Sequence, residues 1–129
     1  MMRSENDISK IIVDCAYKIH VEIGPGLLES VYELILFEKI KNAGLQVAKQ
    51  CPIKVHYENY NLDKRFIADI IVENKVIIEL KSKEHIHPAD KMQLLTYLRM
   101  SNLKLGLLIN FGEYRIKDGI KRVINGMIT

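Results

Sequence analysis

The chain lacks the sequence features of several protein classes. No apolar run approaches the ~20 residues of a membrane-spanning helix, and residues 1–10 lack the apolar core of a signal peptide. There is no Gly-rich phosphate loop, no Ser-His-Asp pattern and no zinc signature. No repeat, low-complexity tract or linker interrupts the sequence. We therefore expect one cytoplasmic domain that spans residues 1–129.

The chain also has few cysteines and a small net charge. Cys15 and Cys51 are far apart and fit no metal-ligand spacing. Because disulfides are rare in reducing compartments, we expect both to be buried thiols. The 19 Lys and Arg residues exceed the 16 Asp and Glu residues by a net charge of +3. This mild excess permits contact with phosphate groups but does not demonstrate it.

Apolar spacing predicts three helices. The first covers residues 6–21, and Pro25 between two glycines ends it. The second covers residues 27–42 before Gly44, with an apolar face that includes Leu28, Val31, Ile35 and Phe37. The third covers residues 88–100 and begins at Pro88. Its expected core residues are Met92, Leu94, Leu95 and Leu98.

The remaining segments read as strands. Residues 45–57 have a β pattern in which Pro52 suggests an edge or a bulge, followed by a polar turn over residues 58–64. Two further strands lie within residues 66–82, and a nearly continuous apolar run over residues 104–111 predicts a strand covered on both faces. In the tail, Asp118-Gly119 is a hairpin signal, with a short helix as the alternative. The order predicts an α/β fold with a mixed central sheet flanked by helices.

The charged residues that could carry chemistry are concentrated in residues 66–82. If residues 73–75 close a hairpin, the antiparallel register places Asp69 opposite Glu79. Opposed side chains have Cβ atoms about 4.5–5.5 Å apart, so one of the two carboxylates takes up a proton or a cation lies between them. Lys81 lies on the same strand face as Glu79. The alternative is a structural cluster in which Lys81 pairs with one acid.

Two predicted helices carry polar residues that share a face. Glu29 and Tyr32 lie three residues apart on the second helix, and Gln93 and Tyr97 lie four apart on the third. Each could serve the acidic site, and the alternative is ordinary surface polarity or packing. Basic residues of the C-terminal half could form a nucleic-acid surface or merely a solvated face. These residues are Lys83, Lys91, Arg99, Lys104, Arg115, Lys117, Lys121 and Arg122.

Short motifs of this sequence resemble those of a known group of enzymes. Asp69 followed by Glu79-Leu80-Lys81 resembles the D…(E)xK signature of the PD-(D/E)XK nuclease superfamily. Gln93 and Tyr97 resemble the QxxxY motif of its exonuclease-like branch. GLLESVY, residues 26–32, is similar to the GxxExxY motif, which names a small prokaryotic family placed in that superfamily. One departure is that Ala68 replaces the proline before the first acid.

This resemblance implies a restriction-endonuclease-like αβββαβ core and hydrolysis of phosphodiester bonds in DNA or RNA. It implies a divalent-metal site with Asp69, Glu79 and Glu29 as ligands, in which Lys81 assists attack and Gln93 and Tyr97 support. Carboxylate oxygens suit Mg²⁺ or Mn²⁺. One alternative is a non-catalytic module that keeps the fold and binds nucleic acid or protein, and another is a subunit that acts only with a partner. A chain of this size would reach both strands of a duplex only as a homodimer.

Overall fold

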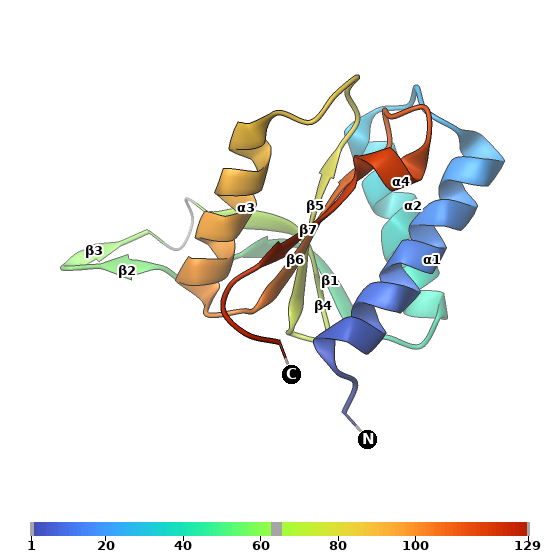
Figure 1. Cartoon of the computed structure of the whole chain (residues 1–129). Coiled ribbons are helices and arrows are strands. Elements are labelled where there is room, and N and C mark those ends of the chain that lie inside the picture. Colours follow the sequence, from blue (N-terminus) through green and yellow to red (C-terminus); the bar gives the residue numbers. More distant parts are fainter. Residues whose placement is uncertain (1, 63–65, 129) are drawn as a thin grey trace.

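A five-stranded sheet with helices on both faces forms the body of the computed structural model, which describes residues 2–62 and 66–128 (Figure 1). The helices are α1 (Glu5–Ile23), α2 (Glu29–Asn42), α3 (Pro88–Ser101) and α4 (Ile116–Gly119). The strands of the sheet are β1 (Val47–Pro52), β4 (Ile67–Val72), β5 (Val76–Lys81), β6 (Leu105–Asn110) and β7 (Ile120–Ile124). Two short strands, β2 (His56–Tyr57) and β3 (Tyr60–Asn61), form a separate ribbon.

The strand order in the sheet is β1-β4-β5-β6-β7. Strands β5 and β6 are parallel and joined through α3, whereas the other neighbours are antiparallel. From α2 to β6 the sheet and its helices follow the order αβββαβ. The prediction of an α/β fold with a mixed sheet is therefore confirmed, as is the edge position of β1, which contains Pro52.

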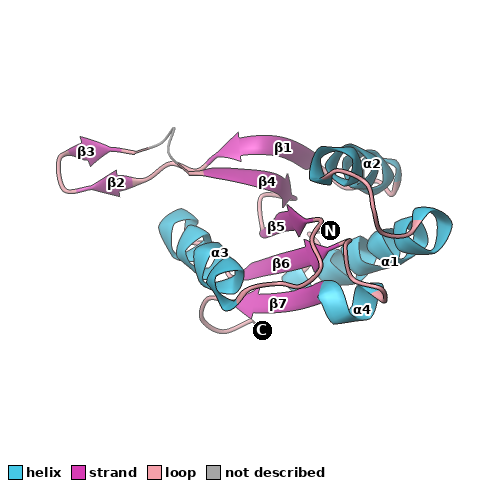
Figure 2. Cartoon of the chain, turned by 90° about the horizontal axis from the view of Figure 1, so that it is seen from above, coloured by secondary structure: helices cyan, strands magenta, loops and turns pink. Residues whose placement is uncertain are grey.

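The helices lie on opposite faces of the sheet, with α3 on one face and α1, α2 and α4 on the other (Figure 2), and an apolar cluster fills each interface. One cluster joins α1, α2 and α4 to side chains such as Ile78 and Leu80, and the other joins α3 to Ile77 and Leu108. Strand β6 is buried along its whole length, as its apolar run predicts. Within residues 2–62 and 66–128, no helix combines the length and apolarity that a membrane crossing requires.

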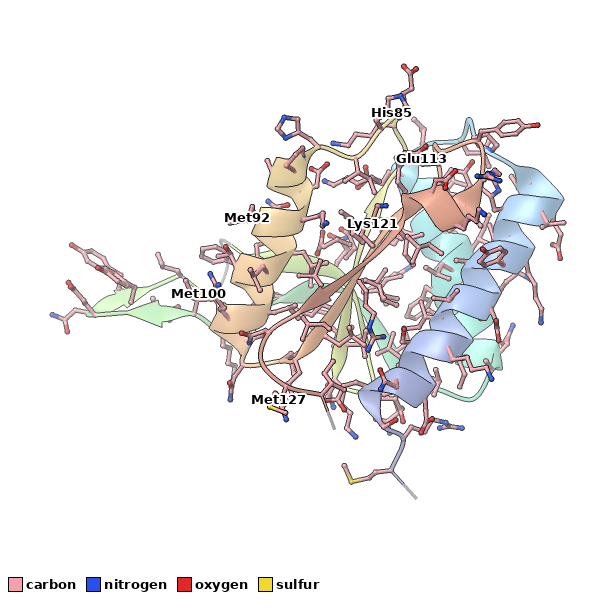
Figure 3. All side chains as sticks on the ribbon, in the orientation of Figure 1. His85, Met92, Met100, Glu113, Lys121 and Met127 are labelled. Carbon is pink, nitrogen blue, oxygen red and sulfur yellow. The ribbon has the colours of Figure 1, made fainter. Side chains whose placement is uncertain are left out.

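The predicted apolar face of α2 is correct for Ile35 and Phe37, which pack against the core, and wrong for Leu28 and Val31. Tyr32, Leu36 and Ile40 are its buried residues, while Leu28 is 74% exposed and Val31 is exposed as well. The helix carries apolar residues on more than one side, so spacing alone does not select the face that packs. On α3, Leu94 and Leu98 are buried as predicted and Leu95 is half-buried. Met92 is 60% exposed and lies on the outer side of the helix in Figure 3, so its assignment to the core is wrong.

The tail corrects the hairpin expectation. Asp118-Gly119 belongs to the short helix α4, and β7 then pairs antiparallel with β6. Gly119 serves close packing instead of a turn, because a Cβ there would lie 2.3 Å from the carbonyl oxygen of Asn110. The predicted polar turn over residues 58–64 contains β3, which the sequence pattern did not indicate, and its last residues, 63 and 64, lie outside the described residues.

Gly112 is a position where the backbones of two loops nearly touch. A Cβ at Gly112 would lie 2.1 Å from the carbonyl oxygen of Lys83, and this neighbour is backbone that cannot rotate away. We expect Gly112→Ala to lower the free energy of unfolding by about 2 kcal/mol or more, because overpacking forces the two loops apart. Urea unfolding measures this change. Gly126→Ala, where nothing lies within 4 Å and only the left-handed backbone resists, is the control with a smaller loss. Equal losses in both variants would contradict the steric explanation.

Candidate functional site

The hairpin β4–β5 has the predicted register. Its paired residues are Ile70 with Ile78, Ile71 with Ile77, and Val72 with Val76. The amide of Lys75 donates to the carbonyl of Val72 at 3.0 Å, and Glu73 and Asn74 adopt left-handed backbone angles in the turn. Continuing this register by one residue places Asp69 opposite Glu79.

The regular ladder stops at Asp69, and carboxylates replace backbone carbonyls there. The amide of Asp69 donates to Oε1 of Glu79 at 3.2 Å, and the amide of Leu80 donates to Oδ2 of Asp69 at 2.8 Å. On the other edge of β4, its pairing with β1 skips Gln50 of β1, whose φ of 51° is left-handed. Two acidic side chains therefore meet in a gap between β4 and β5, as the sequence predicts.

Burial and mutual repulsion dominate the electrostatics of this pair. Glu79 is only 7% exposed. Burial, followed by the negative charge of Asp69, raises the pKa of Glu79 from 4.5 to about 8. Lys81, the half-buried last residue of β5, opposes this rise only weakly. No ion pair joins Lys81 to either acid in the described part of the chain, so the alternative of a simple salt bridge is not found.

A cavity of about 370 Å³ opens beside Asp69. Glu29, the first residue of α2, lines this cavity together with Asp69, Gln50 and Leu80. Although Glu29 as a whole is exposed, burial raises the pKa of its carboxyl, and the positive charge of Lys81 acts against that rise. The structure thus places Glu29, from a separate helix, beside Asp69.

Tyr32 fixes the loop that leads to Glu29. Its hydroxyl donates to the carbonyl of Gly24 at 2.5 Å and accepts from the amide of Leu27 at 3.2 Å. Its ring stacks on Phe111 with a centroid distance of 4.5 Å. Tyr32 is fully buried, so it acts through packing and loop geometry, which is the alternative that the sequence left open for it.

Helix α3 contributes Tyr97 and Gln93. Tyr97 is half-buried, and its ring packs edge-on against Phe66 with a centroid distance of 5.8 Å. Burial, followed by the charges of Glu79 and Asp69, raises the pKa of the Tyr97 phenol. Its hydroxyl is therefore within electrostatic reach of the acidic pair. Gln93 is exposed one turn earlier on the same helix.

Asn110 is a positioning residue that sequence reasoning missed. It is fully buried, its Oδ1 accepts from the amides of Lys83 and Gly112, and its Nδ2 donates to the carbonyl of Lys83 at 2.9 Å. The amide of Phe111 donates to the carbonyl of Lys81 at 2.9 Å. These bonds fix the chain directly after Lys81. The only signal in the sequence is one amide residue near the end of the apolar run of β6.

The donor set suits a hard divalent cation. Each carboxylate of the pair uses one oxygen for a backbone amide, Oδ2 of Asp69 and Oε1 of Glu79. Mg²⁺ is typically held by one or two carboxylates together with waters and substrate phosphate. Within the described ranges, no group of three or more His, Cys, Asp or Glu side chains is arranged to hold a metal on its own. A cation here would therefore depend on the two opposed acids and on ligands that come with it.

Three of the predicted basic residues are engaged within the chain. Lys83 pairs with Asp90 at 2.6 Å, and Arg115 pairs with Asp118 at 3.3 Å. Arg122 donates to the side chains of Asn6 and Ser9. Lys121, another of the predicted basic residues, lies on β7 near the middle of the view in Figure 3. The expected basic stripe is thus reduced by internal pairing.

Comparison with known proteins identifies one family. The model of a family described as the PD-(D/E)XK nuclease superfamily matches residues 6–123, which include all six predicted site residues. Neither a curated protein nor a solved structure matches the chain. Members of that superfamily generally use divalent metals and act on nucleic acids.

Proposed function

Because the chain belongs to the PD-(D/E)XK nuclease superfamily, with a restriction-endonuclease-like fold, we propose that it hydrolyses phosphodiester bonds in DNA or RNA. One observation carries this proposal. Asp69 and Glu79 meet in the gap between β4 and β5, each bonded to the other strand's backbone, with Lys81 two residues further along. Structural packing does not require two acids at this point, since the rest of the β4–β5 ladder is apolar.

Each residue has a role that its position supports. Asp69 and Glu79 hold Mg²⁺ or Mn²⁺, which when bound polarises the phosphoryl group and lowers the pKa of a bound water. The Lys81 ammonium stabilises negative charge that develops on the phosphoryl oxygens. Glu29, across the cavity from β4, accepts a hydrogen bond from a water and completes the acidic set.

Helix α3 supplies the supporting residues. The Tyr97 hydroxyl donates to a phosphate oxygen, which is favourable because a tyrosine with a raised pKa stays protonated at neutral pH. Gln93, exposed on the preceding turn, binds the substrate backbone. The motif GLLESVY, residues 26–32, supports placement in the GxxExxY family, since its Glu faces the cavity and its Tyr locks the loop before α2.

A cleavage assay tests this function. Purified protein is incubated with end-labelled single-stranded and double-stranded DNA and RNA, with Mg²⁺, with Mn²⁺ or with EDTA. We expect metal-dependent products in at least one substrate class. Sedimentation of the protein with a duplex also tests whether a homodimer binds it. Absence of products with every substrate and both metals would contradict the proposal.

The second candidate is a non-catalytic module that binds nucleic acid or a protein partner. The observation that favours it is that the described residues hold no ready-made group of three metal-ligating side chains. Salt-dependent nucleic-acid binding without metal-dependent products would support this candidate over the nuclease.

A further inference from the structure

The ribbon β2–β3 is an arm that projects from the body of the molecule. It lies between Pro52, the end of β1, and Ile67, the start of β4. Both views show it extending beyond α3 and away from the five-stranded sheet (Figures 1 and 2). Among the described residues its strands pair with each other alone, and their tip is the two-residue turn Glu58-Asn59.

The base of the arm is firmly anchored. Ile53 is 4% and Val55 is 2% exposed, and both pack in the cluster below α3. The amide of Ile53 donates to the carbonyl of Phe66 at 2.7 Å, and the amide of Leu62 donates to that of Val55 at 2.9 Å. The ring of Phe66 also contacts Tyr97. The arm is thus joined to the helix face that belongs to the candidate site.

The tip presents two aromatic rings to solvent. Tyr57 and Tyr60 are directly opposed in the ribbon, so their side chains lie on the same face. Tyr57 is 59% and Tyr60 is 64% exposed. Neither ring contributes to a described apolar cluster, so folding does not explain why this tip carries two aromatic residues.

We propose that this tyrosine pair binds unpaired nucleic-acid bases by stacking, and so holds a single-stranded segment for the β4–β5 site. The inference rests on the proposed function and names its substrate class as single-stranded. Aromatic side chains stack on successive bases without sequence preference, and bases of an intact duplex are not available to them. Glu58 at the tip is acidic, so stacking and not phosphate attraction supplies the affinity there.

Chain continuity relates the arm to the acidic pair. Asp69 is the third residue of β4, directly after the point where the arm rejoins the sheet. Lys54, exposed between β1 and β2, adds a positive charge at the base of the arm. A single-stranded nucleic acid bound at the tip therefore lies near the end of β4 that carries Asp69.

Binding of an oligothymidylate in EDTA tests this inference without cleavage. The chain has six tyrosines and no tryptophan, so its emission comes from tyrosine, and the anisotropy of an end-labelled oligothymidylate gives the affinity of every variant. We expect binding to quench this emission and Tyr57→Ala/Tyr60→Ala to weaken the affinity about tenfold or more. Tyr57→Phe/Tyr60→Phe keeps the rings and should bind as the parent does. Tyr114→Ala, at a residue that is 89% exposed elsewhere, is the matched control and should not change binding.

Two results would overturn the inference. One is unchanged oligothymidylate affinity in the double alanine variant, and the other is a dimer that this variant loses, which would make the arm a contact between copies of the chain. The cleavage assay is scored separately. Cleavage by the parent with normal binding by the alanine variant refutes only the arm, whereas tyrosine-dependent binding without any cleavage refutes only the nuclease.

Discussion

Replacing Lys81 by Met is expected to lower the rate of metal-dependent cleavage on the order of 10³-fold, and Asp69→Asn by a similar factor. Lys81→Met removes the only charge of β5 that can offset a developing phosphoryl charge, while it keeps the length of the side chain. Asp69→Asn removes a ligand charge but leaves an oxygen that can accept from the amide of Leu80. Single-turnover cleavage of an end-labelled strand measures both rates.

Matched variants separate the site from general effects of charge. Lys10→Met and Asp14→Asn, both at exposed positions of α1, carry the same chemical changes outside the site. Both should cleave at the parental rate. If Lys81→Met or Asp69→Asn retained more than about a tenth of the parental rate, the proposed assignment of roles would be refuted.

The stability of the metal-free protein is expected to fall as pH rises from about 5 to 8. Glu79 ionises with a pKa of 4.5 in the unfolded chain and about 8 in the folded protein. Between these values only the folded state holds the proton, so its contribution to stability is greatest below pH 4.5 and is lost above pH 8. The slope is about 1.4 kcal/mol for each pH unit, and the whole effect amounts to a few kcal/mol.

Urea unfolding of the parent and of Glu79→Gln in EDTA isolates this effect, because other titrating groups are shared. As pH rises from 5 to 8, the unfolding free energy of the parent should fall by a few kcal/mol relative to that of Glu79→Gln. Adding Mn²⁺ at pH 8.5 should restabilise the parent and leave Glu79→Gln unchanged. A difference that stays constant from pH 5 to pH 8 would contradict a buried, proton-holding Glu79.

The sequence was sufficient where a local signal has one structural solution. A three-residue break between apolar runs set the hairpin register, and with it the opposition of Asp69 and Glu79. Pro52 indicated an edge strand or a bulge because it cannot donate to a neighbour, and β1 is an edge strand. The apolar run of β6 indicated a strand covered on both faces.

The sequence was insufficient where packing chooses between equivalent solutions. Helix α2 is apolar on several sides, so its own sequence does not decide whether Tyr32 or Leu28 is buried. Packing against α1 and stacking on Phe111 bury Tyr32. Asp118-Gly119 has hairpin chemistry, but close contact with β6 places the pair in a helix. The hydrogen bonds of Asn110 join segments far apart in the chain, which no local pattern reports.

The most direct test of the central claim is calorimetric titration of Mn²⁺ into the protein at pH 7 in two buffers of different ionisation enthalpy. If the acids of β4 and β5 together receive a cation, Mn²⁺ should bind with release of about one proton, because Glu79 must ionise, and Asp69→Asn should abolish the binding. Undiminished binding in Asp69→Asn, or no binding by the parent, would contradict the claim.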